Sequence, residues 1–187
     1  MENRYCAFLR GVNVRGTAMK MDKLAVSFSE MGFDNIKTIQ ASGNVLFNNN
    51  HNINQEELKD MIEEELSRYF NYEANVFIRN KGEIEEILTA CSKIPTPEEC
   101  HHYILLCDYK EYMEEIQDIF KRLSPTLPEQ FHTLSSEGKA LPEAIWIVPK
   151  GSTLSSEFGA KVLGSKKYKS IFTSRNKNTL EKVYKSL

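Results

Sequence analysis

Three polar loops carry the side chains of this sequence that are best suited to bind a ligand. They are Arg10-Gly-Val-Asn-Val-Arg-Gly16, Gln40-Ala-Ser-Gly-Asn44 and Ser174-Arg-Asn-Lys-Asn-Thr179. Arginine pairs with phosphate or carboxylate through parallel hydrogen bonds, and asparagine amides add directed hydrogen bonds. Glycine lets backbone N–H groups approach a ligand closely. The chemistry that these loops predict is the binding of an anion.

The candidate ligand-binding residues are Arg10, Asn13, Arg15, Gly16, Ser42, Asn44, Arg175, Asn176 and Asn178. Each loop also has an explanation that requires no ligand. Glycine and asparagine adopt the turn conformations that the first two loops need. In the third loop, Asn178 and Glu181 have the spacing of a capping box for the last helix. Arg175 and Lys177 near that helix start oppose the helix dipole, and a bound anion would offset this cost.

The sequence contains no recognisable catalytic machinery, and we predict no catalytic residues, no cofactor and no metal. The loops match neither a Walker A sequence nor a dinucleotide-binding fingerprint. A group of potential zinc ligands lacks the spacing of any familiar zinc module, and its role is left open. This group is Cys91, Cys100, His101, His102 and Cys107. Whether the protein is an enzyme also stays open.

Composition places the chain among ordinary globular proteins. Of its 187 residues, 41% are hydrophobic and 27% are charged, which argues against long-range disorder. No apolar run approaches the ~20 residues that cross a bilayer, and the N-terminus lacks the apolar region of a secretory signal. We therefore expect a cytoplasmic protein with no membrane association and with reduced cysteines. The oligomeric state is left open, with a monomer favoured.

Positive charge is concentrated at the C-terminal end. Residues 150–187 hold nine Lys/Arg and two Asp/Glu, a net charge of +7, whereas residues 1–149 carry −9. Such an asymmetry is typical either of a surface for anions, nucleic acid or a partner, or of a solvated helix face followed by a basic tail.

The first half of the chain has the pattern of one β-α-β-β-α-β unit. The expected elements are a strand at 4–9, a helix at 20–31, strands at 36–40 and 45–47 around a turn at 42–44, a helix at 55–70 and a strand at 74–79. This order is that of a ferredoxin-like unit. The first two strands run parallel in it, so the loop after strand one and the 40–44 turn are expected at the same end of the sheet.

The second half repeats this order after a helix at 82–92 and the helix-breaking Pro95 and Pro97. Its expected elements are a strand at 102–108, a helix at 110–123, strands at 131–134 and 144–148 around a turn at 136–138, a helix at 154–163, a strand at 171–173 and a final helix at 176–186. The predicted fold is α+β, with two tandem ferredoxin-like units, antiparallel sheets and an extra C-terminal helix. The predicted domains are 1–93 and 98–187, and the repeat is expected in element order and not in residue identity.

The three loops together resemble the bacterial domain-of-unknown-function family 1697. Its members look like LRGINVGG and QSGNVVF near the start and TTRNWNT near the end. The corresponding stretches here are 9–16, 42–47 and 173–179. The resemblance implies an α+β fold of two ferredoxin-like halves and implies no activity. Arg15, Ala41 and Lys177 depart from the pattern, and Lys177 replaces a tryptophan that would offer a stacking surface.

We therefore expect a protein that binds an anionic small molecule, such as a nucleotide or a phosphorylated metabolite. Binding of RNA through the basic C-terminal segment is one alternative, although an RNP1-like run is missing. A protein-interaction module without ligand is the other, and in that case the three loops serve only the fold.

Overall fold

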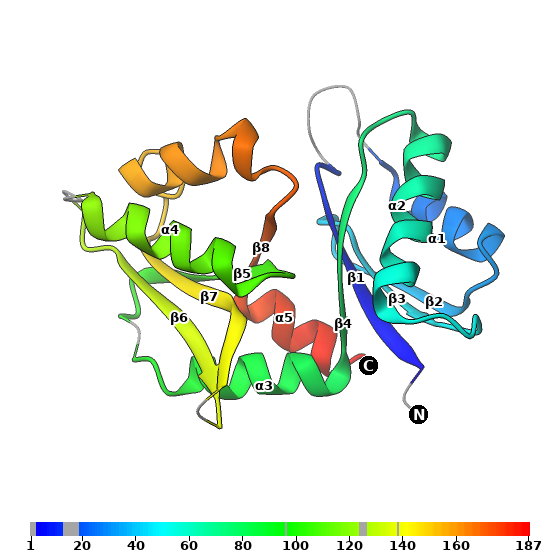
Figure 1. Cartoon of the computed structure of the whole chain (residues 1–187), viewed down its shortest axis with the longest axis horizontal. Coiled ribbons are helices and arrows are strands. Elements are labelled where there is room, and N and C mark those ends of the chain that lie inside the picture. The colour runs from blue at the N-terminus through cyan, green and yellow to red at the C-terminus, as the bar shows by residue number, and fades with distance from the viewer. Residues whose placement is uncertain (1–2, 13–18, 96, 124–126, 138) are drawn as a thin grey trace. The chain divides into compact units, whose positions relative to one another are not determined.

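The computed structural model describes residues 3–12, 19–95, 97–123, 127–137 and 139–187 (Figure 1). The chain divides into two compact units. The first comprises Met1–Ile84 together with Glu181–Leu187, and the second comprises Glu85–Leu180. Each unit contains one four-stranded antiparallel sheet. The predicted α+β class with antiparallel sheets is thereby confirmed.

The first unit contains four strands and two helices in the order β-α-β-β-α-β. These are β1 (Arg4–Arg10), α1 (Met21–Glu30), β2 (Asp34–Ile39), β3 (Asn44–Asn48), α2 (Gln55–Phe70) and β4 (Asn75–Asn80). The strands are arranged in the order β2-β3-β1-β4. Alternate strand residues such as Ala7, Leu9 and Val76 pack with Leu24 of α1 and Ile62 of α2 in one apolar core, so both helices cover the same face of the sheet.

Local signals explain both ends of α2 and the end of α1. The Asn54 side chain accepts the N–H groups of Glu56 and Glu57, and Glu57 reciprocates at the Asn54 N–H, so α2 begins with a complete capping box. Asn71 ends α2 in the left-handed conformation. Gly32 follows α1 with φ +84°, a conformation that glycine adopts without strain. The predicted bounds 55–70 of α2 are confirmed.

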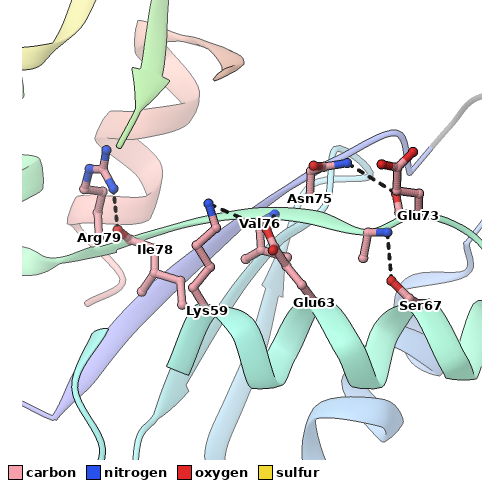
Figure 2. Close-up of polar contacts among 9 residues, drawn as sticks. Lys59, Glu63, Ser67, Glu73, Asn75, Val76, Ile78 and Arg79 are labelled. Carbon is pink, nitrogen blue, oxygen red and sulfur yellow. Dashed lines mark hydrogen bonds and ion pairs between the residues drawn. The ribbon is translucent and has the colours of Figure 1, made fainter. Parts of the chain in front are cut away.

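Helix α2 closes the outer edge of β4 with polar side chains spaced four residues apart (Figure 2). Ser67 Oγ accepts the Ala74 N–H at 3.0 Å, Glu63 Oε1 accepts the Val76 N–H at 2.7 Å, and Gln55 Nε2 donates to the Ile78 carbonyl at 2.9 Å. Lys59 lies on α2 between Gln55 and Glu63. Its Nζ is 3.7 Å from Glu63 Oε1 and 5.0 Å from the Phe77 ring centroid. An edge strand otherwise presents unpaired backbone groups for aggregation, and this polar ladder occupies them.

Helix α3 (Lys81–Ser92) begins in the first unit, and its residues from Glu85 on belong to the second. The second unit continues with β5 (Cys100–Cys107), α4 (Lys110–Arg122), β6 (Gln130–Ser136), β7 (Lys139–Pro149), the π-helix η1 (Gly159–Leu163), the 3-10 helix η2 (Lys166–Tyr168) and β8 (Phe172–Asn176). Helix α5 (Lys177–Tyr184) begins in the second unit, and its residues from Glu181 on belong to the first. The strand order of the second unit is β6-β7-β5-β8. Its core is formed around Trp146 of β7, Ile116 of α4 and Phe158.

Three sequence predictions differ from this structure. The 154–163 segment, predicted as an α-helix, is a π-helix over 159–163, because Gly159 and its neighbours close wider turns. Strand β7 begins at Lys139 and not at 144, because the β6–β7 hairpin continues to the pair Ser136 and Lys139. The hairpin turn in the first unit covers 40–43, and Asn44 already belongs to β3. Gly138 of the predicted 136–138 turn lies outside the described residues.

Within the described ranges, no helix is long and apolar enough to cross a membrane.

Candidate functional site

In the first unit, the loop after β1 and the β2–β3 turn lie against each other. The Leu9 N–H donates to the Gly43 carbonyl at 2.8 Å, and a Cβ added at Gly43 would lie 2.4 Å from Val12 Cγ2. The Met19 N–H donates to the Val12 carbonyl at 3.2 Å, which joins the two described ends of the loop. The base of the loop is therefore fixed on the turn. Asn13, Arg15 and Gly16 lie outside the described residues.

The polar side chains of the turn hold the turn itself. Asn44 is fully buried, and its Nδ2 donates to the Ile39 carbonyl at 2.8 Å and to Ser42 Oγ at 2.9 Å. Gln40 and Gly43 have φ values of +57° and +69°, so the backbone reverses in a conformation that side-chain hydrogen bonds support. These contacts give Ser42 and Asn44 a structural role, and their role toward a ligand stays a prediction.

Arg10 is the last residue of β1 and lies opposite Asn75 of β4 in the antiparallel register. Leu9 belongs to the core under the helices, so the alternation of β-strand side chains places Arg10 on the other face of the sheet. Phe8 and its register partner Asn44 share that face. Arg10 is half-buried, and desolvation lowers the pKa of its guanidinium below the ordinary value of an arginine. The group is still charged at neutral pH, and it is less well hydrated than an exposed arginine.

Tyr72 lies beside the start of the same loop, and no sequence pattern points to it. Its Cε2 is 4.0 Å from the position of a Cβ at Gly11. Its Oη is buried and has no hydrogen-bond partner in the described part of the chain. Burial, with the charge of Glu63 as the second cause, raises the pKa of Tyr72 to about 12. The phenol therefore keeps its proton at neutral pH and is a hydrogen-bond donor with no acceptor among the residues that the structure describes.

The third loop lies in the second unit, where β8 passes directly into α5. Arg175 is buried, and its Nη1 donates to Thr173 Oγ1 at 2.8 Å and to the Ser174 carbonyl at 2.9 Å. The guanidinium thus turns back along the strand, and the expected conflict with the helix dipole is correspondingly smaller. Asn176 Oδ1 accepts the Asn178 N–H at 3.0 Å. The prediction that Asn178 caps the helix is wrong, because α5 begins at Lys177.

The same three residues, Arg-Asn-Lys, recur at the corresponding strand-to-helix junction of the first unit as residues 79–81. Arg79 is buried, and its Nη1 donates to the preceding carbonyl, Ile78 O, at 2.6 Å (Figure 2). Asn80 Oδ1 accepts the Glu83 N–H at 2.9 Å. We expected the halves to repeat in element order and not in residue identity, and the shared tripeptide is a local identity at this one junction. The shared Arg-Asn-Lys tripeptide is apparent in the sequence once the two strand-to-helix junctions are aligned.

We predict that Asn80→Ala and Asn176→Ala each lower the free energy of unfolding by about 1 kcal/mol, because each removes the acceptor for a first-turn N–H. Asn178→Ala is the control, since its exposed side chain follows the cap and is not the cap. Urea unfolding of the three variants measures the differences. A larger loss in Asn178→Ala than in Asn176→Ala would contradict this assignment of the cap.

The remaining candidate groups have structural surroundings. Among the described residues, no group of three or more His, Cys, Asp or Glu is placed to hold a metal ion. All four cysteines are buried thiols outside any disulfide, and burial raises the pKa of Cys91 to about 12. In the basic segment, Lys167 pairs with Glu115, which also accepts the Tyr168 hydroxyl at 2.9 Å. One of the lysine charges is thus partly neutralised within the unit.

The chain resembles known proteins in sequence and in fold. The family model described as "Protein of unknown function (DUF1697)" matches residues 2–136. The conserved bacterial protein SP0830 from Streptococcus pneumoniae has a similar structure, with a TM-score of 0.75 over 99% of this chain and 98% of that chain. The two sequences are 15% identical, so this likeness concerns the fold alone. No curated protein matches the sequence.

Proposed function

The chain belongs to the DUF1697 family of proteins of unknown function, and we propose that it binds an anionic small molecule beside the loop after β1. The proposed ligands are nucleotides or phosphorylated metabolites. Arg10 supplies the charge, and Asn13, Arg15 and Gly16 of the loop supply amide, guanidinium and backbone donors. The turn that contains Ser42 and Asn44 supports the loop. We propose a separate group of anion-binding residues in the second unit, formed by Arg175, Asn176 and Asn178.

The observation that carries this proposal is the half-buried Arg10 next to a loop base that is fixed on the turn. A partly desolvated guanidinium interacts more strongly with an anion than an exposed one does, because water screens the charge less. A loop whose ends are already held loses less conformational entropy when it closes on a ligand. The donor Tyr72 Oη near Gly11 gives additional support.

Arg10→Ala is expected to abolish ligand-induced stabilisation. We expect a nucleotide or phosphate compound to raise the melting temperature of the natural chain by roughly 5–10 °C at ~100 times its dissociation constant. A thermal-shift screen measures this. Arg68→Ala is the matched control, because Arg68 is an exposed arginine that pairs with Glu65 on α2. The proposal fails if no ligand shifts the natural chain, or if Arg10→Ala shifts as much as Arg68→Ala does.

A function without a ligand is the second candidate, and one observation favours it. Asn44, Ser42, Arg175 and Asn176 all make hydrogen bonds that hold turns or strand ends. If the loops serve only the fold, Arg10→Ala lowers the melting temperature and changes nothing else. RNA binding through Lys166, Lys167 and Lys169 would instead be salt-dependent and lost on charge reversal.

We also propose that each half is a ferredoxin-like unit and that the halves arose by duplication, with the 1–93 and 98–187 division as the corresponding domains. The element order, the matching strand orders β2-β3-β1-β4 and β6-β7-β5-β8, and the repeated Arg-Asn-Lys junction support this. A crystal structure in which the four strands of one half cannot be superposed on those of the other would contradict it.

The cytoplasm stays our predicted location, and fractionation of cells that produce the tagged chain would test it.

A further inference from the structure

Glu129 is a buried carboxyl group directly before β6, in the second unit. It is 9% exposed, and its Oε2 accepts the indole N–H of Trp146 at 2.9 Å. The Ser156 side chain lies close to the carboxyl group and favours its charged form. The other oxygen, Oε1, is buried without a hydrogen-bond partner among the described residues. A carboxylate has about four acceptor positions, so much of this group's capacity is unused.

Trp146, which donates to Glu129, also packs against the segment between β7 and β8, residues 150–164, which we call the 150–164 segment. Ser156 Oγ accepts the Gly159 N–H at 2.8 Å at the start of the π-helix. Trp146 packs against Phe158 with ring centroids 5.3 Å apart. Thr153 Oγ1 donates to the Tyr103 hydroxyl at 3.2 Å. Glu129 is thus joined through Trp146 to the part of the fold that departs from regular α-helix, and it lies close to Ser156 of that part.

We propose that Glu129 and Trp146 form a pH-sensitive latch, in which the neutral carboxyl group keeps the 150–164 segment on the sheet of the second unit and its ionisation loosens the segment. The step is the loss of one proton from the carboxyl group to water, with no other reactant. The segment then moves to admit water to the carboxylate, because an ionised group with an unsatisfied oxygen is costly in a dry site.

Burial makes the charged form of Glu129 unfavourable, and the groups around it only partly offset this effect. From β7 it faces the Trp146 indole, and from the 150–164 segment it faces the Ser156 hydroxyl and the Glu157 carboxylate; no described Lys or Arg acts on its charge. Desolvation is the main cause that raises the pKa of Glu129 above 4.5, and the repulsion from Glu157 adds to it. The hydrogen bond from Trp146 and the nearby Ser156 hydroxyl act in the opposite direction, each more weakly than desolvation and more strongly than Glu157.

The direction of the pH effect follows from this raised pKa. Below pH 4.5 the carboxyl group is protonated in both the folded and the unfolded chain and contributes no pH dependence. As the pH rises from 4.5 to the pKa of the folded protein, the unfolded chain releases its proton first. The folded state therefore loses stability over this window, and above it the loss is constant.

Trp146 is the single tryptophan of the chain, so its fluorescence reports on the latch directly. We expect the emission of the natural chain to change with pH at a midpoint above 4.5, and Glu129→Gln to abolish this change while keeping an acceptor for the indole N–H. Glu157→Gln is expected to lower the midpoint and retain the change, since it removes only the repulsion. Glu111→Gln on α4 is the exposed control.

Hydrogen exchange provides a second readout. Amides of the 150–164 segment are expected to exchange faster above the fluorescence midpoint in the natural chain, and at a pH-independent rate in Glu129→Gln after correction for intrinsic exchange. A flat emission profile between pH 4 and 8 would overturn the proposal. A fluorescence midpoint that Glu157→Gln leaves unchanged would also overturn the proposal. This test does not depend on whether Glu129→Gln folds.

Discussion

Gly159→Ala is expected to lower the free energy of unfolding by about 3 kcal/mol, more than a typical single substitution does. An added Cβ would lie 2.0 Å from the Thr153 carbonyl oxygen and 3.1 Å from a ring carbon of Trp146. The carbonyl belongs to the backbone and the indole is fully buried, so neither moves without disturbing the core. Only a residue without a side chain fits at the start of the π-helix.

Thermal unfolding followed by circular dichroism measures this loss, which corresponds to a fall in melting temperature of roughly 6–12 °C. Gly82→Ala is the matched control. Gly82 lies in α3, where an added Cβ would meet its nearest neighbour, Asn80 Oδ1, at an ordinary 3.4 Å. Alanine is the better helix former there, and we expect a gain of about 0.5 kcal/mol. Equal effects of the two substitutions would contradict the packing described for Gly159.

Gly43→Ala is expected to have the second largest effect, a loss of about 2–3 kcal/mol, and to disturb the proposed site. Two costs combine at this position. Its φ of +69° is strained for alanine, and the added Cβ would lie 2.4 Å from Val12 Cγ2 and 3.1 Å from Leu9 Cβ. The base of the loop would have to move away from the turn.

A double-mutant cycle with Val12→Ala separates these two costs. Val12→Ala removes the side-chain atom that meets the new Cβ, so the double variant is expected to be more stable than the sum of the single effects predicts. The strain from φ, about 1–2 kcal/mol, stays in both variants. The free energies of unfolding are measured with urea. Additive losses would show that the Val12 side chain does not clash with the new Cβ at position 43.

Sequence patterns predicted the regular elements well where local chemistry fixes them. Helix α2 has its predicted bounds because Asn54 and Glu57 form a capping box and the apolar residues recur on one helix face. The element order also correctly predicted the loop after β1 and the β2–β3 turn at the same end of the sheet, which is where the structure has them. Hydrophobic periodicity and helix caps depend on residues close together in the chain. Both can therefore be recognised in a single sequence.

Other features depend on contacts that a single sequence does not contain. The π-helix at Gly159 depends on the backbone of Thr153 and the ring of Trp146, which periodicity does not register. The amide of Asn44 reaches back to Ile39, so a candidate ligand group holds a turn. Tyr72 has no sequence signature, because the burial of its hydroxyl is apparent only from the structure. The Arg-Asn-Lys repeat is present in the sequence, but three residues stand out only when the two strand-to-helix junctions are known to correspond.

An NMR titration tests whether an anion binds beside the loop after β1. The isotope-labelled chain is titrated with inorganic phosphate and then with a nucleoside monophosphate, and backbone amide shifts are followed. We predict saturable shifts at Gly11, Val12 and Gly43, with Arg10→Ala removing them and Arg68→Ala leaving them unchanged. Shifts confined to Lys166–Lys169 (or no saturable shift anywhere in the chain) would contradict binding at this loop.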